Sequence, residues 1–348
     1  MDKKVVNRIS EILEPTEEQK DKMFNNILDK YKDENKNKRG FTPLKRLRPR
    51  LVAVMVAFCL ITTTAFAASY LGLDIKFLDF LNPSSNEQAE YLAKGASIIG
   101  KQVKNKDGTI EFKQVIGDSN VTLILVDFTA PDGTVLNKPH YSFKDIYTDI
   151  LGNHGFYSYG FISLEDEDIK DNKTTMVLRM ISRDSFVGKK IHLKLTDLQG
   201  ADTIPGDFTT IVSGAWETRF NLDFKDYSAN YEVDKVIKMF DYDATIDTIS
   251  ISPISVVLKL KSPFTEEIKE AAGNWEVLGP NEYSDIYPIT IKYKDGTSET
   301  TDTFNGMHHL DHLSGEILFI KTFENVINDK EIQSITFFDT EIPIIDQD

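Results

Sequence analysis

Residues 109–129, TIEFKQVIGDSNVTLILVDFT, decide the fold class of this 348-residue chain. The segments 109–116 and 121–129 are rich in β-branched and aromatic residues and follow the two-residue period of a β-strand. Gly117-Asp118-Ser119-Asn120 joins them, and Pro131-Asp132-Gly133 ends the second; these residue types favour turns. We therefore expect two strands joined by a short turn.

Similar strand-like segments, separated by polar turns, continue almost to the C-terminus. Short strands at close spacing, with no helices between them, predict antiparallel β-sandwiches. The stretch 198–205 is the expected boundary, so that residues 101–205 form a first sandwich and residues 214–348 a second, immunoglobulin-like sandwich. We expect strands at 156–164, 174–182 and 190–196 in the first, and at 216–224, 231–239, 245–252, 254–260, 286–293, 297–303, 315–323 and 332–339 in the second.

The run LVAVMVAFCLITTTAFAASYLGL, residues 51–73, is uncharged and predicts a transmembrane helix. At about 1.5 Å per residue it would extend roughly 34 Å, enough for a hydrocarbon core of about 30 Å. Lys and Arg precede the run and Asp follows it, so the positive-inside rule places the N-terminus in the cytoplasm and the C-terminal region outside the cell. The expected fold class is thus mainly β, with a short cytoplasmic helical segment and one transmembrane helix.

A cleaved signal peptide is the alternative to a retained span, because Ala65-Phe66-Ala67 has the form of a cleavage site. Signal peptides occupy about 15 to 30 N-terminal residues, whereas some 50 mostly polar residues come first here. The retained anchor is therefore the expectation.

Charge changes sign along the chain. Residues 1–50 hold 14 Lys+Arg against 9 Asp+Glu, whereas the whole chain has a net charge of -15. The basic part suits contact with anionic membrane lipid, and the acidic part argues against nucleic-acid binding. Cys59 is the single cysteine, which excludes a disulfide framework and a thiolate metal site.

Residues 1–50 are expected to form a cytoplasmic helical segment with a basic linker at 35–50. Met23, Phe24, Ile27 and Leu28 recur at helical spacing and form an apolar stripe. So small a segment cannot bury its own stripe, since chains below about 40 residues rarely hold a stable core. Loose packing, dimerisation or contact with the inner leaflet would cover it, as would binding to a cytoplasmic partner. Residues 74–100 are expected to form a juxtamembrane segment with one short helix.

His308, His309 and His312 form the strongest cluster that could carry chemistry. Imidazoles four residues apart could share a metal ion on a helix, but neighbouring Gly and Ser residues favour a solvated loop. Acidic groups at 165–171 and at Asp241, Asp243 and Asp247 are expected to be solvated turns, with calcium binding as the alternative. The sequence contains no nucleophile-elbow, P-loop or dinucleotide signature, so we expect a protein that is not an enzyme and takes no cofactor.

The aromatic residues Trp216, Trp275, Tyr157 and Tyr159 have two possible roles. They could line a groove for a carbohydrate or a peptide, or they could fill the core of a sandwich. Core packing is the commoner use of such residues.

The order of parts resembles a family of Gram-positive envelope proteins. The resemblance is carried by EPTEEQKDKMFNNILDKY before the apolar run and KQVIGDSNVTLILVDFTAPDGTVL after it. WETRF at 216–220 and ISISPISVVLKLK at 249–261 are similar to the immunoglobulin-like domain often found C-terminal in that family. Members look like membrane-bound anti-sigma factors with an outer domain of unknown function.

The resemblance implies that the N-terminal segment holds an extracytoplasmic-function sigma factor while the outer β-domains sense the envelope. Many anti-sigma factors bind zinc through His and Cys, yet residues 1–50 contain neither, so binding would rest on Met23, Phe24, Ile27 and Leu28. The alternative is a membrane-anchored envelope module that binds wall polymer or another protein and has no transcriptional role.

Overall fold

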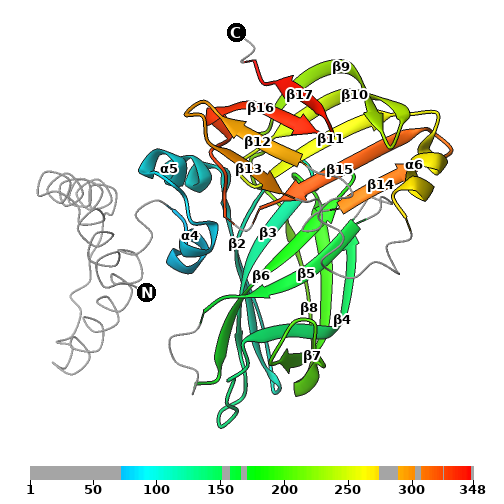
Figure 1. Cartoon of the computed structure of the whole chain (residues 1–348). Coiled ribbons are helices and arrows are strands. Elements are labelled where there is room, and N and C mark those ends of the chain that lie inside the picture. The colour runs from blue at the N-terminus through cyan, green and yellow to red at the C-terminus, as the bar shows by residue number, and fades with distance from the viewer. Residues whose placement is uncertain are drawn as a thin grey trace, which may run out of the picture. The chain divides into compact units, whose positions relative to one another are not determined.

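The computed structural model describes residues 72–150, 157–165, 171–273, 289–301, 307–323 and 325–345 (Figure 1). All of them belong to one compact unit, residues 65–348. The hairpin expected at 109–129 is confirmed: β2 (Gly108–Gly117) pairs antiparallel with β3 (Val121–Thr129). The Asp118 amide donates to the Val121 carbonyl at 2.8 Å and closes the turn.

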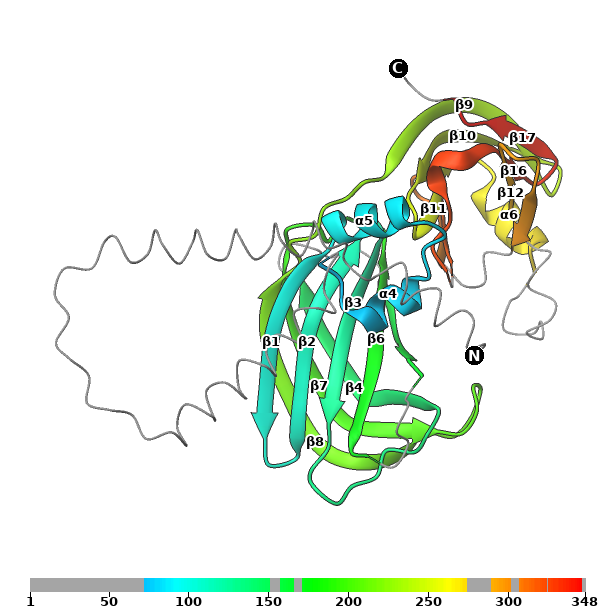
Figure 2. The ribbon, with the colours of Figure 1, turned by 90° about the vertical axis from the view of Figure 1, so that its left-hand side faces the viewer.

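Two facing antiparallel sheets form the first sandwich (Figure 2). The five-stranded sheet has the order β1-β2-β3-β6-β5, with β1 at Ser97–Asn105, β5 at Tyr157–Ser163 and β6 at Lys173–Ser182. The three-stranded sheet has the order β4-β7-β8, with β4 at His140–Ile150, β7 at Lys190–Ala201 and β8 at Thr209–Asn221.

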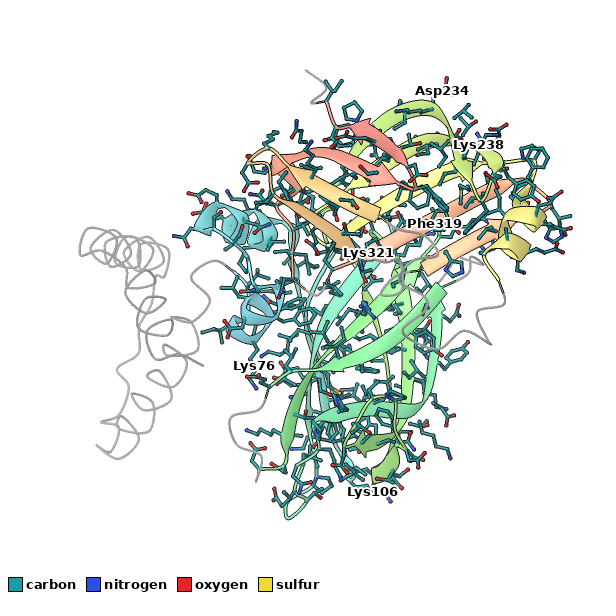
Figure 3. The ribbon with its side chains drawn as sticks, in the orientation of Figure 1. Lys76, Lys106, Asp234, Lys238, Phe319 and Lys321 are labelled. Atoms are coloured by element: carbon teal, nitrogen blue, oxygen red, sulfur yellow. The ribbon has the colours of Figure 1, made fainter. Side chains whose placement is uncertain are left out.

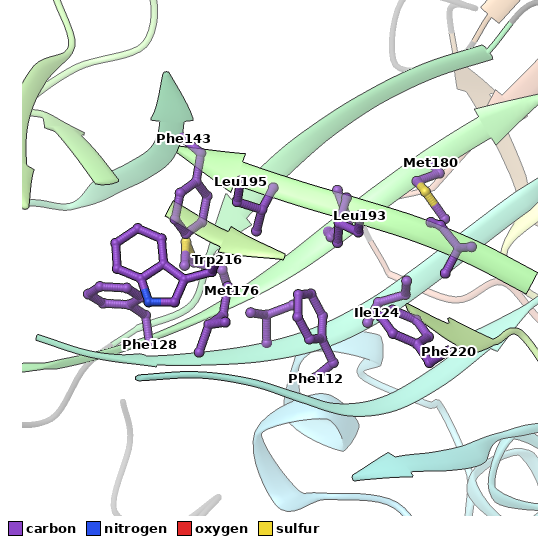
Figure 4. Packing of buried hydrophobic residues seen from close by; sticks show 14 of the residues in the cluster. Phe112, Ile124, Phe128, Phe143, Met176, Met180, Leu193, Leu195, Trp216 and Phe220 are labelled. Carbon is purple, nitrogen blue, oxygen red and sulfur yellow. The ribbon is translucent and has the colours of Figure 1, made fainter. Parts of the chain in front are cut away.

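The core of the first sandwich lies between its two sheets (Figure 4). Phe112 and Ile124 come from the five-stranded sheet, and Leu193 and Trp216 from the other. Trp216 is 1% exposed, and its ring meets that of Phe128 edge to face at 5.1 Å. Because side chains of a strand alternate between its faces, the sandwich buries every second residue over 191–195 of β7 and 216–220 of β8.

The second sandwich combines a five-stranded and a four-stranded antiparallel sheet. The first has the order β14-β15-β11-β10-β9, comprising β9 (Ala229–Met239), β10 (Tyr242–Ile251), β11 (Ser255–Lys261), β14 (Met307–Asp311) and β15 (Glu316–Thr322). The second has the order β13-β12-β16-β17, comprising β12 (Ile289–Tyr293), β13 (Ser298–Thr301), β16 (Ile332–Phe337) and β17 (Thr340–Pro343). Helix α6 (Thr265–Ala271) follows β11, and a 3-10 turn (Asp329–Glu331) precedes β16.

Two short helices precede the first strand. Helix α4 (Ile75–Leu81) begins at Asp74, whose carboxylate accepts the Lys76 amide at 3.0 Å. Helix α5 (Asn86–Gly95) begins at Ser85, whose hydroxyl accepts the Gln88 amide at 3.2 Å. Both starts are side-chain N-caps, which satisfy amides that a helix leaves unpaired.

The structure corrects the predicted fold class, which included a transmembrane helix over residues 51–73. Among the described residues no helix is both long and apolar enough to cross a membrane, and residues 51–71 lie outside them. The end of the apolar run is described, and there Leu73 is 2% exposed and packs in the protein's own core with Phe77 and Leu81. Hydropathy shows that a residue is apolar, but it does not show whether lipid or the protein's own core covers that residue. The described fold is mainly β, with three short helices.

Two further expectations are wrong in their local placement. The segment 216–224 was grouped with the second sandwich, but β8 pairs with β7 and places Trp216 in the core of the first. The predicted boundary therefore falls between two strands of one sheet. The segment His308–Asp311 was expected to be a loop, but β14 pairs with β15 from Met307 to Asp311. Tertiary pairing overrides the Gly and Ser residues that flank it.

Candidate functional site

The two sandwiches and the helices α4 and α5 meet in a common apolar region, which we call the junction. Its described core contains Phe77, Leu81 and Leu92 from the helices, Leu123, Leu125 and Val177 from the first sandwich, and Val257, Leu318 and Ile320 from the second. On β3, Ile124 and Val126 face the first core while Leu123 and Leu125 face the junction. Burial on both faces explains why residues 123–126 of β3 are all apolar.

Asp118 is the polar centre of the junction. It lies in the β2–β3 turn, is 2% exposed, and accepts hydrogen bonds at Oδ2 from the hydroxyls of Ser252 (2.5 Å) and Ser255 (2.6 Å) in the β10–β11 turn. Its Oδ1 accepts the amides of Asn120 and Val121 at 2.8 and 2.7 Å. One carboxylate therefore ties a turn of the first sandwich to a turn of the second.

Burial raises the pKa of Asp118 above its ordinary value, while the four hydrogen bonds act in the opposite direction. Removal from water disfavours a charged carboxylate, and donors that point at it favour the charge. Four donors on its two oxygens satisfy the hydrogen-bonding capacity of the ionised carboxylate. Asp118 therefore links the two sandwiches, and the desolvation of its charge opposes folding.

A tyrosine pair reinforces the junction beside α5. The rings of Tyr91 and Tyr227 lie 4.6 Å apart, and the Tyr91 hydroxyl donates to the Tyr227 carbonyl at 3.2 Å. Lys330 Nζ lies 4.4 Å from the Tyr91 ring and Lys225 Nζ lies 4.5 Å from the Tyr227 ring, both within cation–π range. The pair joins α5, the linker between the sandwiches and the 3-10 turn of the second sandwich.

Two hollows adjoin the junction. The first, which we call the junction cleft, has a volume of about 360 Å³ and is lined by Phe80, Val121, Leu123, Ile162, Arg179, Ile254, Thr322 and Phe323. The second, which we call the polar pocket, has a volume of about 520 Å³. It is lined by Ser84, Tyr293, Asp295, Thr297, Glu299, Lys321, Thr322, Phe323, Asn325, Val326, Ile327, Asn328 and Glu331.

The polar pocket lies at the end of β15, beyond the last β15 side chain that packs in the core of the second sandwich. Phe319 fills the second core, and Lys321, two residues further on the same face, is 3% exposed (Figure 3). Burial, followed by the nearby carboxylates, raises the pKa of Tyr293 to about 12. Asp295 accepts both the amide and the hydroxyl of Thr297, at 2.8 and 2.6 Å, and so shapes the β12–β13 turn. The Asp295 carboxylate at the edge of the polar pocket therefore stabilises the β12–β13 turn.

The histidines singled out from the sequence do not converge. His308 and His309 are consecutive residues of β14, so their side chains point to opposite faces, and His312 lies in the following turn. The His308 ring lies 6.4 Å from that of Phe319. Within the described part of the chain, no group of three or more His, Cys, Asp or Glu is arranged to hold a metal ion.

The acidic clusters do not form a calcium site in the described residues. Asp243 pairs with Lys238 at 2.8 Å and Asp247 pairs with Lys261 at 2.5 Å, so both are engaged by cations across neighbouring strands. Residues 166–170 of the other cluster lie outside the described residues.

The aromatic candidates have different fates. Trp216 is a core residue, whereas Tyr159 is 40% exposed and donates to the Ile146 carbonyl at 2.9 Å. Trp275 and the side chain of Tyr157 lie outside the described residues. The partner-binding candidates Met23, Phe24, Ile27 and Leu28 also lie outside them.

Sequence reasoning missed the residues that define the junction. Asp118 stands in a turn signal, and Ser252 and Ser255 flank the bend at Pro253, all of which are typical of exposed loops. One usable signal was the four consecutive apolar residues 123–126 inside the otherwise alternating segment, because a strand exposed on one face alternates throughout.

Comparisons with known proteins establish no family. No protein-family model matches the sequence, and no curated protein matches it. A solved structure described as the conserved domain protein from Bacillus anthracis is similar, with a TM-score of 0.46 and 14% sequence identity. The similarity covers 69% of this chain and 75% of that one, and at this level it carries no argument about family or function.

Proposed function

We propose that this chain is a non-enzymatic regulator in which the N-terminal segment holds a protein partner and the two sandwiches control that interaction. The partner, by the resemblance described above, is a sigma factor, bound through Met23, Phe24, Ile27 and Leu28. The observation that carries the proposal is the position of α4, which follows the N-terminal segment in the chain and packs its buried residues Phe77 and Leu81 against both sandwiches in the junction.

The two buried side chains of α4 set the size of the free energy that couples α4 to the junction. Phe77 is 0% and Leu81 is 2% exposed, and full burial of such a side chain stabilises by about 1.5–3 kcal/mol. Withdrawing both from the junction would therefore cost about 3–6 kcal/mol, as an upper estimate. A change in the junction and a change in the segment before α4 are linked by a coupling free energy that acts in both directions.

Capture of a sigma factor by the full-length chain tests this proposal. We expect Phe24→Asp combined with Leu28→Asp to abolish capture, because two charges on the apolar stripe oppose burial in a partner. Asn25→Asp combined with Asn26→Asp is the matched control, since it adds the same charge away from the stripe. Equal capture by both double variants would contradict the proposal.

An envelope-binding module is the second candidate, and one observation favours it. On the outer face of the sheet β4-β7-β8, Tyr147 is 54% exposed and its ring lies 5.7 Å from that of His192. His192 Nε2 in turn lies 2.8 Å from a carboxylate oxygen of Glu217. An exposed aromatic ring beside polar groups suits a sugar or a peptide.

Deleting residues 2–34 separates the two candidates. The regulator loses its partner and its target transcripts rise, whereas the module keeps its binding to wall polymer, which Tyr147→Ala would weaken. Unchanged transcription after the deletion would favour the module.

A further inference from the structure

The junction cleft has the composition of a binding site for an amphipathic small molecule. Six of the eight described residues that line it are apolar or aromatic, and its volume of about 360 Å³ falls within the range of about 300–1,000 Å³ typical of ligand pockets. Such pockets occur preferentially at interfaces between domains, and this cleft takes residues from α4 and from both sandwiches.

Arg179 is the charged group among the described residues that line the cleft. It lies on β6 opposite Leu123 of β3, and its Nη1 donates to the Thr322 hydroxyl of the second sandwich at 3.3 Å. A guanidinium carries five N–H donors in a planar fork that matches a carboxylate. A guanidinium can therefore bind a hydroxyl and an anionic group at the same time.

Gly160 leaves space beside this guanidinium. It pairs with Arg179 across β5 and β6, and directly opposed residues of neighbouring strands project to the same face. A Cβ added at Gly160 would meet no atom within 4 Å, and its φ is not in the left-handed region. The backbone does not require glycine here, and a side chain at this position would stand beside Arg179 on the same face of the sheet.

We propose that the junction cleft binds a single-chain amphiphile with an anionic head group. The head lies at Arg179, and the apolar chain lies over Leu123, Phe80 and Phe323. The composition of the described lining selects this ligand class, because it has one cationic side chain, one hydroxyl and six apolar or aromatic side chains. The site is a property of the described sandwiches and does not depend on the proposed sigma-factor partner.

Calorimetric titration of the full-length protein tests the site. The probes are dodecanoate, dodecanol and dodecylamine below their micellar concentrations, which share a chain and differ in the head. We expect one dodecanoate per chain, bound at least about tenfold more tightly than the amine, a difference of about 1.4 kcal/mol. Equal binding of all three by the wild type would refute the anionic preference.

Two variants locate the binding. Gly160→Leu adds a side chain beside Arg179 on the face of the sheet that carries the cleft and is expected to weaken dodecanoate binding at least tenfold, while the exposed Ser213→Leu on β8 is the matched control. Arg179→Met keeps the apolar stem, removes the charge, and is expected to make the three probes bind alike; Arg219→Met, an exposed change on β8, is its control.

Every variant retains the apolar run 51–73, so binding of amphiphile to that run cannot produce a difference between them. Undiminished dodecanoate binding by Gly160→Leu would overturn the proposal, because the ligand would then sit elsewhere. If Arg179→Met fails to fold, the Gly160→Leu comparison still decides, since a Cβ added at residue 160 meets no atom within 4 Å.

Discussion

Replacing Asp118 by alanine should break the link between the two sandwiches. The carboxylate accepts two amides of its own turn and two hydroxyls of the second sandwich. The serine hydroxyls can rotate toward other acceptors, and the Ser252 hydroxyl already lies 3.4 Å from the Ser255 carbonyl. The amides of Asn120 and Val121 cannot rotate, and both residues are at least nine-tenths buried.

The magnitude follows from those two amides. Each buried donor left without a partner costs about 1–3 kcal/mol, so the two together cost about 2–6 kcal/mol. Alanine and asparagine both remove the cost of burying a charge. Asparagine keeps a carbonyl oxygen for the two amides and offers its NH₂ to the Ser255 hydroxyl, whereas the Ser252 oxygen already accepts the amides of Ile254 and Ser255. The difference in the free energy of unfolding between Asp118→Ala and Asp118→Asn therefore measures the contribution of the two amide hydrogen bonds.

Urea denaturation of the full-length protein measures this difference. We expect Asp118→Ala to be less stable than Asp118→Asn by about 2–6 kcal/mol, and its unfolding to separate into two transitions as the sandwiches lose their link. A difference below about 1 kcal/mol, with one transition in both variants, would refute the reasoning.

The pH dependence supplies an independent check. Burial raises the folded-state pKa of Asp118 above its ordinary value of 3.8, so the folded state keeps this proton where the unfolded state has released it. The contribution of Asp118 to stability therefore falls as pH rises from about 3.8 through the folded-state pKa. Asp118→Asn lacks the group, so its stability relative to the wild type should increase across that window. Parallel pH profiles would contradict the assignment.

Three further predictions concern packing. Trp216→Ala should lower the free energy of unfolding by about 3–5 kcal/mol, because a fully buried indole leaves a cavity; a loss below about 1 kcal/mol would contradict its core position. Gly117→Ala should cost about 1–3 kcal/mol in the same assay, since its Cβ would lie 2.6 Å from the Val121 carbonyl oxygen, whereas Gly160→Ala should be nearly neutral. A double-mutant cycle of Tyr91→Leu with Lys330→Met should give a coupling of about 0.5–1 kcal/mol, and additive effects would show that the cation–π contact contributes nothing.

Local pattern was sufficient for most strands of the two sandwiches. The β2–β3 hairpin and the strands β6, β10, β15 and β16 lie close to where the alternating segments predicted them. In β10 the two-residue period of a strand makes the core face visible in a single sequence. The strands β3, β6 and β15 are buried on both faces, and their β-branched and apolar residues favour a strand. The helices α4 and α6 were missed, because seven residues are too few to show a helical period.

The candidate site was beyond such reasoning. Asp118 and Ser255 are separated by 137 positions, and each stands in a turn of ordinary composition. The open space at Gly160 likewise exists only beside Arg179, which belongs to the next strand of the sheet. Contacts of this kind depend on which turns and strands the fold brings together, and no local signal records that.

The residue pattern after the apolar run was enough to predict antiparallel strands there, since backbone geometry turns residue alternation into a buried and an exposed face. Tertiary structure alone decided the use of that architecture: it assigned Trp216 to the first sandwich, drew Leu73 into the protein's own core, and buried the Asp118 turn against the second sandwich. Burial and strand pairing each require a second surface to cover or pair with the first. A local sequence pattern describes only the first surface and cannot say which partner it meets.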